Sequence, residues 1–283
     1  MDKTTKCLNC GNTFEGNFCP HCGQKATTKR LHITTMLTQT FKTFVGGDNN
    51  FIKTFTSLCY RPGHMVREYL IGKRSSYVSP IKMLVYMVTA YAFLTFVTHN
   101  DLSVFHDINM DALENTDFEG IFESEDPDDD FDNVAYGNMI RSVMVTIHNL
   151  LSNKVYYMFM YVTFSVLPYR FIFRKQKMER LDGRLLQLNI TEHFYTLLYL
   201  SCISIILVLI LLPFSLIPNS AKPIGYIYHI ADFALTALLY KQMLGISWIK
   251  SIYKNAICIT LAFVILMSLV VLLFLGVAVY QSI

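Results

Sequence analysis

The chain has 283 residues, of which 53% are hydrophobic and only 16% are charged, and its mean hydropathy is +0.36. This composition is too apolar for an ordinary soluble domain of that length, and it indicates a membrane protein. The net charge of +3 gives no sign of nucleic-acid binding, because membrane topology accounts for the placement of the basic residues.

A cysteine array near the N-terminus has the spacing C-x2-C-x8-C-x2-C and consists of Cys7, Cys10, Cys19 and Cys22. Two C-x2-C turns joined by a short spacer bring four thiolates to one tetrahedral zinc ion. We therefore predict a zinc ribbon over residues 1–28. The zinc is expected to be structural, because four cysteines fill its coordination shell and leave no place for substrate. The alternative is a pair of disulfides, which requires an oxidising compartment.

Residues 29–79 are predicted to form cytosolic amphipathic helices that lie at the membrane interface. Apolar residues recur there at helical spacing, as at Phe51 and Phe55. One short helix is predicted to begin at Pro62 and to end at Gly72. Nearby basic residues are expected to meet anionic lipid headgroups, and the alternative is a site for a phosphate-bearing ligand. These basic residues are Arg61, Arg67, Lys73 and Arg74.

Residues 80–283 are predicted to form a polytopic membrane domain. The expected fold class is therefore an all-α integral membrane protein with about five transmembrane helices and a small N-terminal zinc ribbon. An acidic outer loop at 100–138 is expected after the first span, because thirteen of the 21 acidic residues lie between Asp101 and Asp132. The predicted spans are about 81–99, 155–173, 193–217, 223–240 and 256–280.

The placement of Lys and Arg gives an orientation that is independent of hydropathy, because these residues are retained on the cytoplasmic side. With five spans and the N-terminus inside, 21 of the 24 Lys and Arg lie in cytoplasmic segments. We therefore expect a cytoplasmic N-terminus and a C-terminus outside, in the inner (cytoplasmic) membrane. The fourth span is the weakest, and an even number of spans would put both ends inside.

Ionisable side chains at membrane depth are costly, so they are candidates for function. His229 and Asp232 lie three residues apart in the fourth predicted span and share a helix face. This spacing suits either a proton or cation relay in a polar cavity, or hydrogen bonds that join this helix to another span. Glu192 and His193 are adjacent, so they diverge by about 100° on a helix and cannot act side by side. Glu192 also suits a capping role at the start of the third span.

Three blocks of the sequence resemble a known family: C-L-N-C-G with F-C-P-H-C-G-Q near the N-terminus, R-P-G-H-M-V-R-E-Y-L-I-G-K-R-S-S-Y-V-S-P at 61–80, and T-E-H-F at 191–194. Together they resemble a bacterial membrane family catalogued only as a domain of unknown function, which couples a zinc ribbon to several spans. The resemblance implies no activity. Besides the ribbon cysteines, the residues on its motif positions are Arg61, Pro62, Tyr69, Gly72, Lys73, Arg74, Tyr77, Pro80, Glu192 and His193.

The sequence contains no motif of a soluble enzyme: no G-x-S-x-G elbow, no P-loop, no G-x-G-x-x-G and no H-E-x-x-H. We therefore expect a non-enzymatic membrane protein whose ribbon is a cytosolic assembly or regulatory module, with the bilayer and an unidentified protein as partners. The alternative is a small permease or lipid-handling protein with a polar site at His229 and Asp232. Nucleic-acid binding by the ribbon is a minor alternative.

Overall fold

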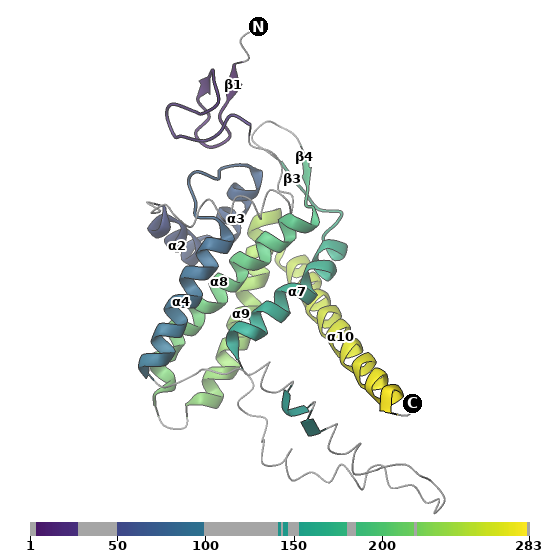
Figure 1. Cartoon of the computed structure of the whole chain (residues 1–283). Helices are drawn as coiled ribbons and strands as arrows, with labels where there is room; N and C mark the ends of the chain where they lie inside the picture. The colour runs from purple at the N-terminus through teal and green to yellow at the C-terminus, as the bar shows by residue number, and fades with distance from the viewer. Residues whose placement is uncertain are drawn as a thin grey trace, which may run out of the picture.

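The structure is a computed structural model that describes residues 4–27, 50–98, 141–142, 144–146, 153–179, 185–217 and 220–281. The predicted acidic loop at 100–138 lies outside these residues, and so does the part of the predicted interfacial segment between 28 and 49. Where the chain is described, a small ribbon at the N-terminus is followed by a bundle of helices (Figure 1).

The ribbon contains two short antiparallel strands, β1 (Thr5–Lys6) and β2 (Thr13–Phe14). After each C-x2-C pair the chain turns at a glycine with positive φ, 79° at Gly11 and 70° at Gly23. Residues with a Cβ rarely adopt this conformation, so glycine is the natural choice at both turns. The two turns bring the two cysteine pairs to the same place.

The remainder is mostly helical, which confirms the predicted fold class at this level. α4, α7, α8 and α9 form a bundle, and α10 packs on α7 and α9 and then leads away to the C-terminus (Figure 1). A hairpin after α7, formed by β3 and β4, was not predicted. The elements are α2 (Phe51–Tyr60), α3 (Pro62–Ile71), α4 (Pro80–Thr98), α7 (Lys154–Ile172), β3 (Lys177–Glu179), β4 (Leu185–Gln187), α8 (Ile190–Ser215), α9 (Ala221–Leu244) and α10 (Trp248–Gln281).

In the described part of the chain, three helices are long and apolar enough to cross a membrane: α4, α8 and the Trp248–Leu269 part of α10. α7 and α9 stand where two further spans were predicted, but they carry tyrosines and charged residues among their apolar ones. α8 is central, because 67% of its apolar window is buried, compared with 22% for α4 and 17% for α10. The three apolar helices indicate a membrane location.

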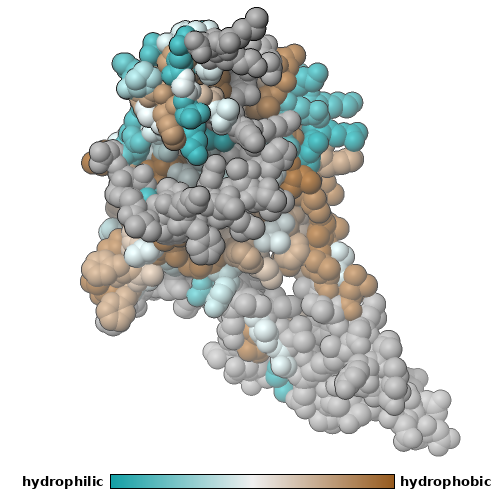
Figure 2. All heavy atoms as spheres, turned by 45° about the horizontal axis from the view of Figure 1, so that its top comes forward, coloured by the Kyte–Doolittle hydropathy of each residue, from teal (hydrophilic) through white to brown (hydrophobic). Residues whose placement is uncertain are grey.

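The outer surface of the bundle is rich in exposed apolar side chains. Phe96 of α4, Phe159 of α7 and Phe263 of α10 are each more than half exposed. In Figure 2 hydrophobic residues cover the sides of the helices, whereas hydrophilic residues gather near the ribbon. Water-soluble proteins rarely expose apolar surface on this scale, so the sides of the bundle suit contact with lipid.

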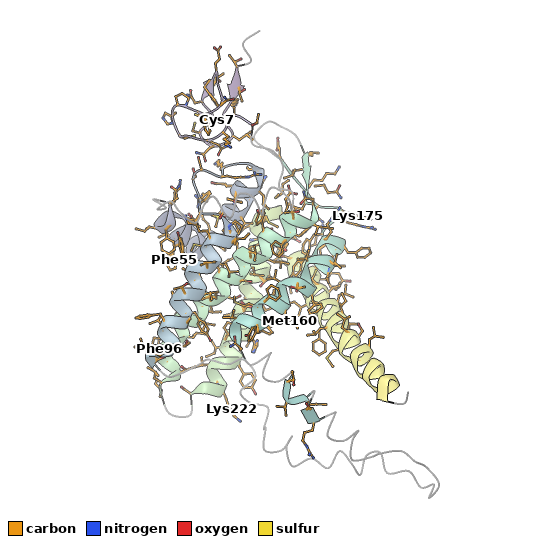
Figure 3. The ribbon with its side chains drawn as sticks, viewed as in Figure 1. Cys7, Phe55, Phe96, Met160, Lys175 and Lys222 are labelled. Atoms are coloured by element: carbon orange, nitrogen blue, oxygen red, sulfur yellow. The ribbon has the colours of Figure 1, made fainter. Side chains whose placement is uncertain are left out.

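The two ends of the bundle differ. Cys7 of the ribbon and Lys175 after α7 lie at one end, and Phe96 and Lys222 lie at the other (Figure 3). The basic segment that follows α7 is therefore on the same side of the bundle as the ribbon. We call this side the ribbon end.

Protein covers much of the apolar faces of α2 and α3, and their predicted location at the membrane interface stays a prediction. Met65 and Val66 of α3 are fully buried, and Phe51 and Phe55 of α2 pack against the same core. Gly63 supplies the physical reason: a Cβ there would lie 2.2 Å from the carbonyl oxygen of Leu239 in α9. Without a side chain at Gly63, the backbones of α3 and α9 come into contact.

Candidate metal centre, docking loop and bundle cavity

The four ribbon cysteines form a group that can hold a metal ion. Their sulfur atoms all lie within 4.8 Å of one another, and the pairs Cys7–Cys22 and Cys10–Cys19 are 3.5 and 3.6 Å apart. A tetrahedral zinc ion with sulfur ligands at about 2.3 Å requires sulfur atoms about 3.8 Å apart, so this arrangement fits. The same distances are far longer than a disulfide bond of about 2.05 Å.

Backbone hydrogen bonds shape both cysteine turns in the same way. In the first turn the Cys7 N–H donates to the Asn12 carbonyl at 2.8 Å, and the Gly11 N–H donates to the Cys7 carbonyl at 2.9 Å. The second turn repeats both bonds twelve residues later, from Cys19 to Gln24 and from Gly23 to Cys19, at the same distances. The sequence spacing is therefore matched by two equivalent knuckles that face one site.

Gln24 attaches the ribbon to residues 72–76, which we call the docking loop. Its side-chain amide donates to the Gly72 carbonyl at 3.0 Å, and its Oε1 accepts from the Arg74 and Ser75 N–H groups at 3.2 and 3.3 Å. Gln24 is only 5% exposed. Because a buried amide without partners is costly, these three bonds favour one position of the ribbon on the loop.

Two further contacts join the ribbon to the docking loop. The Ser76 hydroxyl donates to Asn9 Oδ1 at 2.7 Å. A Cβ at Gly72 would lie 3.0 Å from Leu8 Cδ1, so Leu8 packs directly over the glycine backbone. The ribbon therefore rests on the block at 61–80.

Proline and glycine define the helix ends in this block. Pro62 is the first residue of α3 and Pro80 is the first residue of α4, where a missing N–H costs no helical hydrogen bond. Gly72 follows the last residue of α3 with φ 126°. The helix predicted from Pro62 to Gly72 is confirmed.

Glu68 binds several polar side chains of the same block. Its carboxylate lies 3.6 Å from Arg61 and 3.4 Å from Lys73, and it accepts a hydrogen bond from the Tyr77 hydroxyl at 2.8 Å. Burial alone would raise the pKa of Glu68, but the Tyr77 hydrogen bond and the two cations lower it below its usual 4.5. Burial and the Glu68 carboxylate raise the pKa of Tyr77 to about 12. Arg61 and Lys73, which were predicted to meet headgroups or phosphate, thus form ion pairs with Glu68.

The block at 61–80 meets α8 just after the T-E-H-F block at 191–194. The Tyr69 ring is edge-on to the rings of Tyr195 and Tyr199, with centroids 6.3 and 5.5 Å apart. The Tyr199 hydroxyl donates to the Val78 carbonyl at 2.6 Å. The block at 61–80 therefore packs on the residues of α8 that directly follow the T-E-H-F block, more than a hundred positions later in the chain.

Glu192 and His193 have separate environments. Glu192 and Asn189 form a capping box at the start of α8, because each side chain bonds to the other residue's backbone N–H at 2.8 Å. His193 is fully buried, and among the described residues neither of its ring nitrogens has a hydrogen-bond partner. Glu192 therefore caps α8, as its place at the start of the third predicted span suggested, and the two side chains do not act as a pair.

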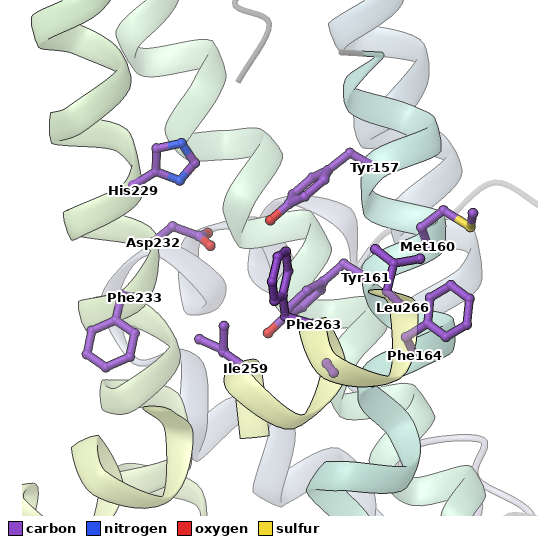
Figure 4. Close-up of a pocket in the computed structure, with 11 residues that line it drawn as sticks. Tyr157, Met160, Tyr161, Phe164, His229, Asp232, Phe233, Ile259, Phe263 and Leu266 are labelled. Atoms are coloured by element: carbon purple, nitrogen blue, oxygen red, sulfur yellow. The ribbon is translucent and has the colours of Figure 1, made fainter. Parts of the chain in front are cut away.

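His229 and Asp232 line a cavity of about 300 Å³ between α7, α9 and α10. Figure 4 shows Tyr157 and Tyr161 of α7 facing them across this cavity. Asp232 Oδ1 also accepts a hydrogen bond from Ser204 of α8, so the carboxylate joins two helices as well as facing the cavity. The hydrogen bond to Ser204 is the interhelical link of the second alternative, and a proton or cation relay stays a prediction.

A buried polar path continues from the cavity along α7. The hydroxyls of Tyr161 and Tyr169 are 3.3 Å apart, and Tyr169 donates to Oδ1 of Asn255 in α10. The Tyr169 ring also stacks on Tyr240 of α9, with centroids 4.8 Å apart. These residues join the three helices that surround the cavity.

The site residues that the sequence did not reveal include Gln24, Glu68, Tyr157 and Tyr161. Glu68 had a local signal, since it lies two helical turns after Arg61 and five residues before Lys73. Gln24, Tyr157 and Tyr161 act through contacts between distant parts of the chain, which spacing does not reveal.

A sequence model of the family described as "Protein of unknown function (DUF3667)" matches residues 48–92. This range contains α2, α3, the docking loop and the first part of α4. No curated protein and no solved structure matches the chain. The similarity therefore covers the surface on which the ribbon rests. The family description names no activity.

Proposed function

We propose that this chain is a polytopic membrane protein in which a zinc ribbon acts as a cytosolic regulatory module on the helix bundle. The observation that carries this proposal is the attachment of Gln24 to the docking loop. Gln24 lies two residues after Cys22, so a change at the metal centre acts directly on the side chain that holds the loop. The loop leads into α4, and zinc binding is thereby linked to the position of α4 in the bundle.

Zinc is the metal that best suits four cysteine ligands at tetrahedral spacing. Bound there, it supplies a crosslink between the two knuckles that Cys7 and Cys19 begin. Four thiolates complete its shell, so the proposed role is structural and regulatory, without a catalytic step. A cytosolic location keeps the thiols reduced and able to bind it.

The proposal places the ribbon end in the cytoplasm of a bacterial inner membrane, with the C-terminus outside. α7 and α9 would be the two further spans, since both pack beside α8 and protein covers part of their surface. The positive-inside rule supports this orientation, because Lys175 lies at the ribbon end. The exposed side chains of Arg174, Lys175 and Lys177 suit anionic lipid headgroups, and the outer face of the ribbon is available to a protein partner.

A comparison of Gln24→Ala with Glu15→Ala tests the proposal in full-length protein in nanodiscs. Glu15 is an exposed ribbon residue, so its variant controls for a change in the ribbon itself. We expect Gln24→Ala to retain its zinc while the N–H groups of Arg74 and Ser75 exchange about tenfold faster or more in hydrogen–deuterium exchange. Exchange that is as slow as in the wild type would show that Gln24 does not hold the loop.

A further inference from the structure

The cavity beside Asp232 lies close to mid-depth in the bundle. Ser204, which donates to Asp232, is the fifteenth of the 26 residues of α8. α8 is about 39 Å long and is apolar enough to cross a membrane, so Ser204 lies near the middle of a span. An acidic side chain at that depth is costly unless a partner or a ligand compensates it.

The walls of the cavity are mainly aromatic and apolar. Tyr157 and Tyr161 come from α7, Phe233 from α9 and Phe263 from α10. Among the described residues that line it, no Lys or Arg is present, Asp232 is the one acidic residue, and His229 is the one residue with a basic side chain. Aromatic faces attract cations through their negative electrostatic potential, and they do so most strongly where water is excluded.

Charge complementarity decides which class of ligand suits this cavity. An anion would meet the Asp232 carboxylate with no lysine or arginine of the wall to offset it. A neutral apolar molecule would cover the carboxylate without compensating its charge. We propose that the cavity binds an organic cation, a small amine or quaternary ammonium with an apolar substituent. The charged group lies beside Asp232 and the substituent lies against Phe233 and Phe263.

The rim of the cavity reaches the outer surface of the bundle. His229 is exposed, and the side chain of Phe263 is 61% exposed. On a membrane-spanning bundle this rim faces lipid, so the ligand enters sideways from the bilayer with its apolar part compatible with acyl chains. For the sequence-based alternative of a permease or lipid-handling protein, this proposal narrows the ligand to an amphipathic cation. The inference does not depend on the ribbon.

The size of the cavity sets the choice of probe. About 300 Å³ is at the lower end of the range for small-molecule sites. Benzyltrimethylammonium has one quaternary charge and one aromatic ring, and benzenesulfonate is an anionic molecule of similar size. Binding of both is measured by equilibrium dialysis with full-length protein in phosphatidylcholine nanodiscs at pH 8, where an imidazole is ordinarily neutral.

Asp232→Asn is the first variant, because asparagine can still accept the Ser204 hydrogen bond while the charge is lost. Glu179→Gln is the matched control, since it removes one negative charge from an exposed strand residue away from the cavity. We expect benzyltrimethylammonium to bind about tenfold or more weakly to Asp232→Asn and unchanged to Glu179→Gln. Equal binding by the wild type and Asp232→Asn, or stronger binding of benzenesulfonate than of the cation, would overturn the proposal.

A second pair of variants keeps the test decisive if Asp232→Asn does not fold. Tyr161→Phe keeps the aromatic face and loses the hydroxyl that contacts Tyr169, whereas Tyr161→Leu loses both. We expect Tyr161→Leu to weaken cation binding by about threefold or more and Tyr161→Phe to change it much less. Equal effects of the two substitutions would contradict recognition by the aromatic face.

Discussion

The N-terminal ribbon and the helix bundle are held together by different interactions. In the ribbon, the buried hydrophobic residues are Cys7, Phe14 and Cys19, and two of these are expected metal ligands. In the bundle, a continuous core of buried residues extends from α2 to α10. So small an apolar core does not stabilise a fold of about two dozen residues. We therefore expect the ribbon, but not the bundle, to need a bound metal for its stability.

This difference makes the ribbon a separable module. Its described attachment to the docking loop includes four hydrogen bonds. Gln24 donates one and accepts two, and Ser76 donates the fourth to Asn9. Leu8 also packs on Gly72. Such an interface is small compared with the core of the bundle, so it can open while the helices remain folded. Loss of metal is therefore expected to change the surface of the bundle without unfolding it.

The largest expected effect comes from Cys19→Ser, which removes a thiolate ligand. Structural zinc contributes about 10–16 kcal/mol to the folding of small cysteine-ligated peptides, so the ribbon is expected to unfold. Zinc content measured by mass spectrometry should fall well below one ion per chain, and limited proteolysis should cut within residues 4–27. The thermal unfolding midpoint of the bundle should change little. A large decrease in that midpoint would show that the ribbon and the bundle do not fold separately.

A mutation in the bundle is expected to have the opposite effect, which is to lower the stability of the bundle without changing the zinc content. Gly63→Ala places a Cβ 2.2 Å from the Leu239 carbonyl oxygen, so α3 and α9 must move apart, at a cost of about 2–3 kcal/mol. The midpoint of thermal unfolding in detergent should fall while the zinc content is unchanged. Gly225→Ala is the control, because a Cβ there meets nothing within 4 Å. Equal midpoints for the two variants would mean that α3 and α9 do not contact each other as described.

The smallest of these effects concerns Glu68. Its pKa in the folded protein lies below the usual 4.5, so its stabilising contribution is present above pH 4.5 and is lost as the pH falls through the lower folded value. Because the ion pairs of Glu68 are partly exposed, Glu68→Gln should lower the free energy of unfolding by only about 0.5–1 kcal/mol at pH 7. The difference from the wild type should shrink as the pH falls below 4.5 and disappear once the pH is below the lowered pKa of Glu68.

Thermal unfolding across this pH range measures the effect, with Glu179→Gln as an exposed control. A difference between Glu68→Gln and the wild type that persists unchanged at low pH would rule out the charge of Glu68 as its source. A decrease of similar size in the control would point instead to the overall charge of the protein.

Features set by neighbouring residues could be predicted from the sequence. The four cysteines were identified by spacing alone, and the ends of α3 by Pro62 and Gly72, because these rules depend on a few consecutive positions. The pair His229 and Asp232 was identified as unusual in an apolar stretch, and the structure places both at one cavity.

Features that depend on distant contacts could not be predicted. Gln24 meets Gly72 across 48 residues, and Gly63 donates its N–H to Gln242 across 179 residues. Hydrophobic periodicity showed that α3 has an apolar face, but it does not distinguish a face covered by lipid from one covered by another helix. For the same reason Tyr157 and Tyr161 gave no sign that they face Asp232.

The most direct test of the central claim, that metal in the ribbon controls the docking loop, is hydrogen–deuterium exchange of wild-type protein in nanodiscs with and without a zinc chelator. Chelation is expected to accelerate exchange at Arg74 and Ser75, whose N–H groups donate to Gln24, while the core amides of α8 stay protected. Unchanged protection at Arg74 and Ser75 after complete loss of zinc would contradict this claim.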